Sequence, residues 1–107
     1  MSFLVREIPA SERPRERLLK HGVRALSDHE LLAIILRTGT KDMSVLDLAK
    51  KVLIEFQNLN RLNEATVSEL KKIKGIGEAK AIEILAAIEL GRRINLPASG
   101  KVILANP

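Results

Sequence analysis

The sequence predicts an all-α fold of five short helices with an N-terminal arm and a C-terminal tail, and three features support this. Ser27 and Thr66 each begin a Ser/Thr-x-x-Glu capping box that is followed by an apolar segment. Apolar residues recur in these segments at helical spacing. Glycine-containing breaks separate the segments from one another. A chain of 107 residues fits one domain with its own core.

The first two helices are defined by signals at their ends. Pro14 suits the first turn of a helix, and His21 followed by Gly22 supplies a basic last turn and a stop, so we expect a helix over 14–21. The capping box at Ser27 predicts a second, short and buried helix over 28–37.

Three further helices are expected after the second glycine-containing break. A serine cap and helical spacing predict a helix over 44–56, and the segment 58–63 has a turn-like composition. The second capping box opens a short helix over 66–73, and the longest helix follows over 78–93. We therefore divide the chain into an arm at 1–13, a helical domain at 14–94 and a linker at 95–107.

The two capped segments form an internal repeat. Placing Ser27 on Thr66 also aligns Glu30 with Glu69, and the alignment continues with similar apolar positions. The repeat predicts an approximate twofold relation between residues 27–56 and 66–93, although short amphipathic helices also match by chance. The positions expected to be buried are Leu31, Ile34, Leu53, Leu70, Ile73, Ile76, Leu85 and Ile88.

Composition narrows the classes of partner. A net charge of +5 favours a polyanionic partner, and residues 1–25 and 66–107 each carry a net +3 while the middle is near neutral. With no Trp or Tyr and two Phe, the chain lacks the aromatic platforms on which single-stranded bases stack. The absence of cysteine and of a long apolar segment predicts a cytoplasmic protein that does not contact a membrane.

The segment 70–81 resembles the helix-hairpin-helix motif, whose core is a glycine-hydrophobic-glycine turn. Gly75 and Gly77 permit a tight turn, and Ile76 between them is expected to anchor it in the core. The free amides at the start of the next helix form an anion site that Lys74 and Lys80 also reach. The alternative is a helix corner whose glycines serve geometry alone, and Glu78 at the helix start opposes anion binding.

The turn of the first repeat is a second candidate phosphate site. Thr38, Gly39, Thr40 and Lys41 offer hydroxyls, amides and one ammonium to a phosphate on the opposite strand. Asp42 weakens this prediction because its carboxylate repels phosphate. A longer turn with one glycine is also compatible with an ordinary loop.

The residue inventory points to neither a metal site nor a catalytic site. His21 and His29 are the only histidines, and no cysteine or carboxylate set completes a ligand cluster around them. The carboxylates are better explained as helix caps and solvated groups than as a general acid and base. We expect no cofactor, no metal and no enzymatic activity in this chain.

Several joint motifs resemble the N-terminal domain of the bacterial RadC family, also called UPF0758. They are Arg13-Pro14-Arg15-Glu16-Arg17-Leu18-Leu19, Ala25-Leu26-Ser27-Asp28, Leu36-Arg37-Thr38-Gly39-Thr40, Ile73-Lys74-Gly75-Ile76-Gly77 and Glu89-Leu90-Gly91-Arg92-Arg93. The resemblance covers nearly all of residues 6–93 and implies a tandem helix-hairpin-helix, or (HhH)₂-like, domain linked by name to DNA repair. In that family a JAMM-type metallohydrolase-like domain follows, with a His-x-His motif that this chain lacks.

Two functional hypotheses follow from these features. The first is a module that binds duplex or branched DNA through its phosphates without reading sequence. The second is a docking domain that positions the family's C-terminal metal-binding domain, with the apolar residues of the arm as its surface. The two differ in salt response, because phosphate binding weakens steeply as salt rises.

Overall fold

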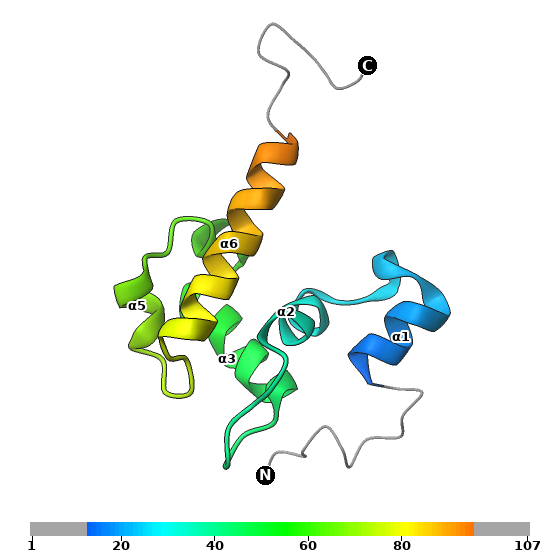
Figure 1. Cartoon of the computed structure of the whole chain (residues 1–107), viewed down its shortest axis with the longest axis horizontal. Coiled ribbons are helices and arrows are strands. Elements are labelled where there is room, and N and C mark those ends of the chain that lie inside the picture. The colour runs from blue at the N-terminus through cyan, green and yellow to red at the C-terminus, as the bar shows by residue number, and fades with distance from the viewer. Residues whose placement is uncertain (1–12, 96–107) are drawn as a thin grey trace, which may run out of the picture.

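The computed structural model describes residues 13–95, and all regular structure in that range is helical (Figure 1). The elements are α1 Pro14–His21, the 3₁₀ turn η3 Val23–Ala25, α2 Asp28–Leu36, α3 Val45–Phe56, α4 Leu59–Leu62, α5 Val67–Lys71 and α6 Glu78–Asn95. The all-α prediction and the five expected helices are confirmed. The expected arm and linker lie outside the described residues, apart from Arg13 and Asn95 at their inner ends.

The capping residues explain where the helices begin. At α2 the Ser27 hydroxyl accepts the Glu30 amide at 3.3 Å, while the Glu30 carboxylate accepts the Ser27 amide at 2.9 Å. Thr66 and Glu69 make the same reciprocal pair at α5, at 3.1 Å and 3.0 Å. Both predicted capping boxes are therefore present, and they satisfy amides that a helix start leaves without acceptors.

The presence of α4 and the early end of α5 are the main differences from the expected helices, and the ends of α2 and α6 differ by one or two residues. Helix α4 falls in the segment predicted to be a turn, because the Asn58 side chain accepts the Arg61 amide at 2.9 Å and acts as a cap. Helix α5 ends at Lys71, and a turn follows in which the Ile76 amide donates to the Ile73 carbonyl at 3.0 Å. The second hairpin is thus a longer turn between a shorter helix and α6.

The core lies where α2 packs on α3 and α6, and α5 packs on α6. Each capped helix therefore pairs with the helix that follows its hairpin turn. Helix α1 lies on the opposite side of α2 from α6 (Figure 1). It is tied to α2 by Arg17, whose guanidinium contacts the Glu30 carboxylate at 2.8 Å.

Of the eight positions predicted to be buried, three are buried and five are partly buried, and among these five Leu53, Leu85 and Ile88 pack against the core. Leu70, Ile73 and Ile76 are buried. The side chains that remain partly exposed are Leu31, Ile34, Leu53, Leu85 and Ile88. In α2 the buried residues are instead Leu32, Ala33 and Leu36. The segment Leu31–Leu36 is apolar on every side, so its spacing does not select a face, and packing against α3 and α6 decides it.

The C-terminal end of α6 is exposed. The C-terminal turns of α6 project away from the other helices, with Leu90 and Ile94 65 % and 80 % exposed (Figure 1). No helix in residues 13–95 combines the length and apolar character that a membrane span requires.

Candidate nucleic-acid interface

The two glycines of the second hairpin have different roles. Gly75 has φ of +103°, and a Cβ there would lie 2.9 Å from Leu48 Cδ1 and 3.0 Å from Thr40 Cγ2. Backbone conformation and packing both require glycine at this position. Gly77 is exposed and lies outside the left-handed region, and a Cβ there would meet nothing within 4 Å. Of these two glycines, Gly75 is the one that the fold requires.

Ile76 holds the turn in the core, as the sequence predicts. Its side chain is 3 % exposed and belongs to the main apolar cluster. The neighbouring residues Gly77 and Glu78 are exposed at the start of α6. The first amides of a helix lack intrahelical acceptors and carry a partial positive charge, so this turn presents donors to solvent.

The first hairpin turn is shaped by two tight backbone conformations. Arg37 has φ of +69°, and the Thr38 amide donates to the Leu36 carbonyl at 2.7 Å, which forms a strained γ-turn. At Gly39 a Cβ would lie 2.2 Å from the Met43 carbonyl oxygen, so a side chain does not fit there. The Thr40 amide closes the loop by donating to Met43 at 2.8 Å.

The structure brings the two predicted turns together. The contact between the Gly75 position and Thr40 places the second turn against the first. Both turns lie at the lower end of the view in Figure 1. The two segments are more than thirty residues apart in the sequence, and they form one surface that we name the hairpin face, comprising Thr38–Lys41 and Lys74–Lys80.

Lys80 joins the two halves of the hairpin face. Its ammonium donates to the Leu36 carbonyl at 2.9 Å and to the Thr38 hydroxyl at 3.0 Å. The first contact caps the C-terminal end of α2, where a cation is favoured by the helix dipole. Lys80 therefore uses two of its three N–H donors inside the molecule and fixes Thr38 beside them.

An ion pair lies beside the Lys80 contact. Arg37 pairs with Glu83 of α6, one turn beyond Lys80. Burial lowers the pKa of Lys80, the Glu83 carboxylate acts against this shift, and the Arg37 charge adds to it. Sequence reasoning missed this network because its members are about forty-five residues apart and no local motif links them.

The basic side chains around the turns come from several elements. Lys41 and Lys74 are exposed on the first and second turns. Lys74 also lines a surface hollow with Lys72 and with Lys51 of α3. Carboxylates share this region: Glu55 and Glu69 line the same hollow, although Glu69 is engaged in its capping box.

The hydroxyls of the first turn already accept hydrogen bonds. Thr38 accepts from Lys80, and the Thr40 hydroxyl accepts the Asp42 amide at 3.2 Å. A hydroxyl that accepts such a bond keeps its own proton for donation, so both threonines retain a donor for an anion. Asp42 and Glu78 are exposed carboxylates at the two turns and oppose an anion.

The histidines belong to no metal-binding cluster in the part of the chain that the structure describes. Residues 13–95 contain no group of three or more His, Cys, Asp or Glu side chains placed to hold a metal ion. His29 lies beside the Ser27 hydroxyl at 3.2 Å, a contact local to the helix cap.

Fold and site define a class: a small all-helical domain with two glycine-containing turns joined on one basic surface. A family model described as UPF0758 N-terminal matches residues 5–82, so the chain belongs to the UPF0758 family and contains its N-terminal region. No solved structure matches the chain at a significant level.

Similar proteins are found in several bacteria. A UPF0758 protein of Geobacillus sp. strain WCH70 is 55 % identical over the whole chain and 48 % of its own length. A relative from Halalkalibacterium halodurans is 63 % identical over 89 % of the chain and 41 % of its own length. The Bacillus subtilis protein YsxA is 58 % identical over 85 % of the chain and 39 % of its own length. The chain therefore spans less than half the length of these curated relatives.

Proposed function

We propose that this domain binds duplex DNA through its phosphates, without reading base sequence, and that the hairpin face is the contact surface. The observation that carries the proposal is the open space at Gly77. A Cβ at this position would meet no atom of the described protein within 4 Å, so packing does not require glycine here. The absence of a side chain leaves the amides at the start of α6 open to approach. An anion held by those amides is close to Lys74 on the same turn.

The contact between the two hairpin turns fixes the spacing of the two proposed phosphate sites. Because Lys80 fixes Thr38 and Gly75 packs near Thr40, the two candidate phosphate sites are held at a constant separation. Phosphate contacts from two rigid turns fix the position of a duplex without carrying sequence information. A helix-hairpin-helix assignment for both turns is part of this proposal.

Amide chemical shifts of the isotopically labelled chain locate the surface directly. On titration with a random-sequence duplex, we expect the largest changes at Gly75, Gly77 and Glu78, with a second group at Thr38–Lys41. The same titration with Gly77→Ala should give weaker binding and an unchanged fold. Changes confined to other surfaces would overturn the proposal.

A second candidate function is protein docking, which the end of α6 favours. Leu90 and Ile94 are the most exposed large apolar residues of this helix, and they lie where it leaves the body of the domain. Docking of the part of the family's proteins that this chain does not span would use such a surface. Binding that persists at high salt and is lost in Leu90→Ser with Ile94→Ser would support docking; the arm residues expected for this role lie outside the described residues.

A further inference from the structure

A groove between α1 and α2 adjoins the hairpin face and has a different chemistry. Its apolar floor is formed by Pro14, Ala33, Ile34 and Val45. Pro14, Ala33 and Val45 are buried, and Ile34 is half-buried. Arg15 of α1 also lines the groove, as do Arg13 before α1 and Arg37 after α2. A ligand that fits the groove combines an anionic group with an apolar surface.

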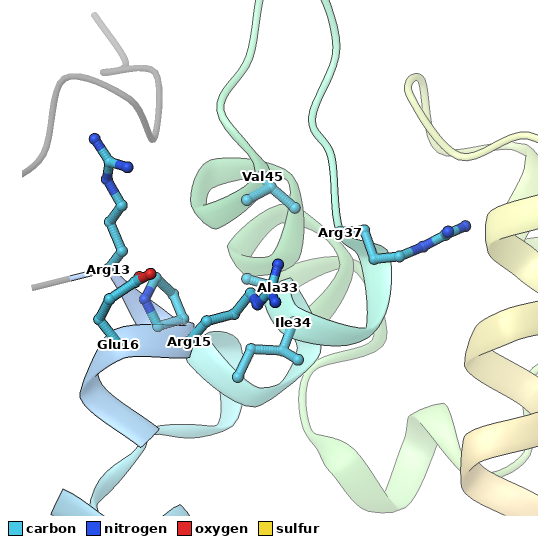
Figure 2. Close-up of a pocket in the computed structure, with 8 residues that line it drawn as sticks. Arg13, Arg15, Glu16, Ala33, Ile34, Arg37 and Val45 are labelled. Carbon is cyan, nitrogen blue, oxygen red and sulfur yellow. The ribbon is translucent and has the colours of Figure 1, made fainter. Parts of the chain in front are cut away.

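The close-up in Figure 2 shows how these side chains are arranged. Arg15 extends from α1 across the groove toward Ala33 and Ile34 (Figure 2). Arg37 points the other way, toward α6, where it pairs with Glu83 (Figure 2). Glu16 also lines the groove and opposes an anion. Arg15 therefore supplies the charge on which the argument rests.

The groove borders the first hairpin turn of the proposed DNA surface. Two of its lining residues, Arg37 and Val45, flank the first hairpin turn and its loop. A DNA strand whose phosphates contact Thr38–Lys41 would therefore lie next to this groove. In continuous duplex the bases are stacked inside the helix, so only an unpaired nucleotide offers a base to an apolar floor.

We infer that this groove binds an unpaired nucleotide at a strand end or flap of the DNA held by the hairpin face, with Arg15 on its phosphate and the apolar floor against its base. This inference rests on the proposed function, because the hairpin face delivers the strand. The domain then prefers DNA with an unpaired segment over continuous duplex. Sequence remains unread, since the floor offers contact area and no pattern of donors and acceptors.

Fluorescence anisotropy with two labelled DNAs tests the inference. One is a continuous duplex, and the other is the same duplex with a short unpaired extension at one end. We expect the extended DNA to bind about fivefold more tightly, the size of one surface charge contact of about 1 kcal/mol. Arg15→Ala should remove this preference and leave the affinity for continuous duplex within about twofold.

The matched control is Arg24→Ala, which removes the same charge from η3 at the far end of α1. It should keep the preference. Equal binding of both DNAs by the parent, or a preference that survives in Arg15→Ala, would overturn the inference while leaving the hairpin face intact. Binding of an acidic peptide with an apolar side chain at Arg15, without any DNA preference, would overturn it too. Failure to bind either DNA would instead contradict the proposed function.

Discussion

At the scale of single residues, the two glycines of the second hairpin differ in what the fold requires of them. Gly75 and Gly77 are two positions apart and look alike in the sequence, where both are explained by turn geometry. In the structure Gly75 faces Leu48 and Thr40, whereas Gly77 faces open space. The contacts that distinguish them come from a distant segment, so the sequence predicts the turn and not the division of roles.

Alanine at these two positions gives opposite results. Gly75→Ala should lower the free energy of unfolding by about 2 to 4 kcal/mol, because φ is unfavourable and the methyl group overlaps Leu48. Gly77→Ala should leave stability within about 0.5 kcal/mol. It should nevertheless weaken duplex binding by about threefold to tenfold, the value of one hindered hydrogen bond. Urea unfolding and anisotropy measure the two effects, and a Gly77→Ala variant that binds like the parent would contradict this assignment.

Lys80 is the second residue whose role the structure refines. The sequence places it one turn into α6, within reach of the phosphate site. Its ammonium in fact caps α2 and holds Thr38. If the domain binds DNA as proposed, Lys80 would act on it through its remaining N–H and through the position of Thr38.

Lys80→Met keeps the aliphatic stem and removes the ammonium. We expect a loss of about 1 to 2 kcal/mol in unfolding free energy, since two charge-assisted hydrogen bonds at a half-buried site are lost. The control Lys50→Met, at an exposed position of α3, should change stability by less than about 0.5 kcal/mol. Equal stability of the two variants in thermal unfolding would show that the Lys80 contacts do not stabilise the fold.

At the scale of elements, local signals predict helix starts well and faces poorly. Ser27 and Thr66 were identified as caps because a capping box is encoded within four residues. Helix α4 was missed because an asparagine before an apolar residue is typical of a turn as well as of a cap. The buried side of α2 depends on which helices pack against it, and a uniformly apolar segment does not indicate which side that is.

The contact between Arg17 of α1 and Glu30 of α2 predicts that the stability of the fold depends on pH. Burial acts to raise the pKa of Glu30, but hydrogen bonds from Ser27 and the charge of Arg17 outweigh it and hold the pKa below its ordinary value of 4.5. A depressed pKa contributes stability above the unfolded value, and this contribution is lost as the pH falls through the folded value. Stability linked to Glu30 is therefore present at neutral pH and disappears below pH 4.5.

Glu30→Gln measures this contribution. The variant should have a lower Tm than the parent at neutral pH, and the difference should shrink as the pH falls below 4.5. Glu55→Gln, at an exposed site on α3, serves as the control for the loss of one carboxylate. A difference between Glu30→Gln and the parent that stays constant down to strongly acidic pH would contradict the assignment.

At the scale of the whole molecule, the packing of α2 against α6 assembles one surface from two distant turns. The sequence predicts both turns and their basic residues, and it predicts a repeat that relates them. Their juxtaposition depends on tertiary packing, so only the structure shows that Thr38–Lys41 and Lys74–Lys80 form one surface. We propose that this surface binds phosphates. The net charge of +5 adds long-range attraction for a polyanion.

The salt dependence of duplex binding tests the central proposal most directly. If the hairpin face neutralises roughly two to four phosphates, a plot of log K against log salt should have a slope of about −2 to −4. The double variant Lys41→Ala with Lys74→Ala removes one exposed ammonium from each turn and should make the slope shallower by about two units. Lys20→Ala with Arg24→Ala removes the same charge from exposed positions away from the hairpin face and should change the slope little. A hairpin double variant that folds and keeps the parent's affinity and slope would contradict the proposal and leave the two turns as structural corners.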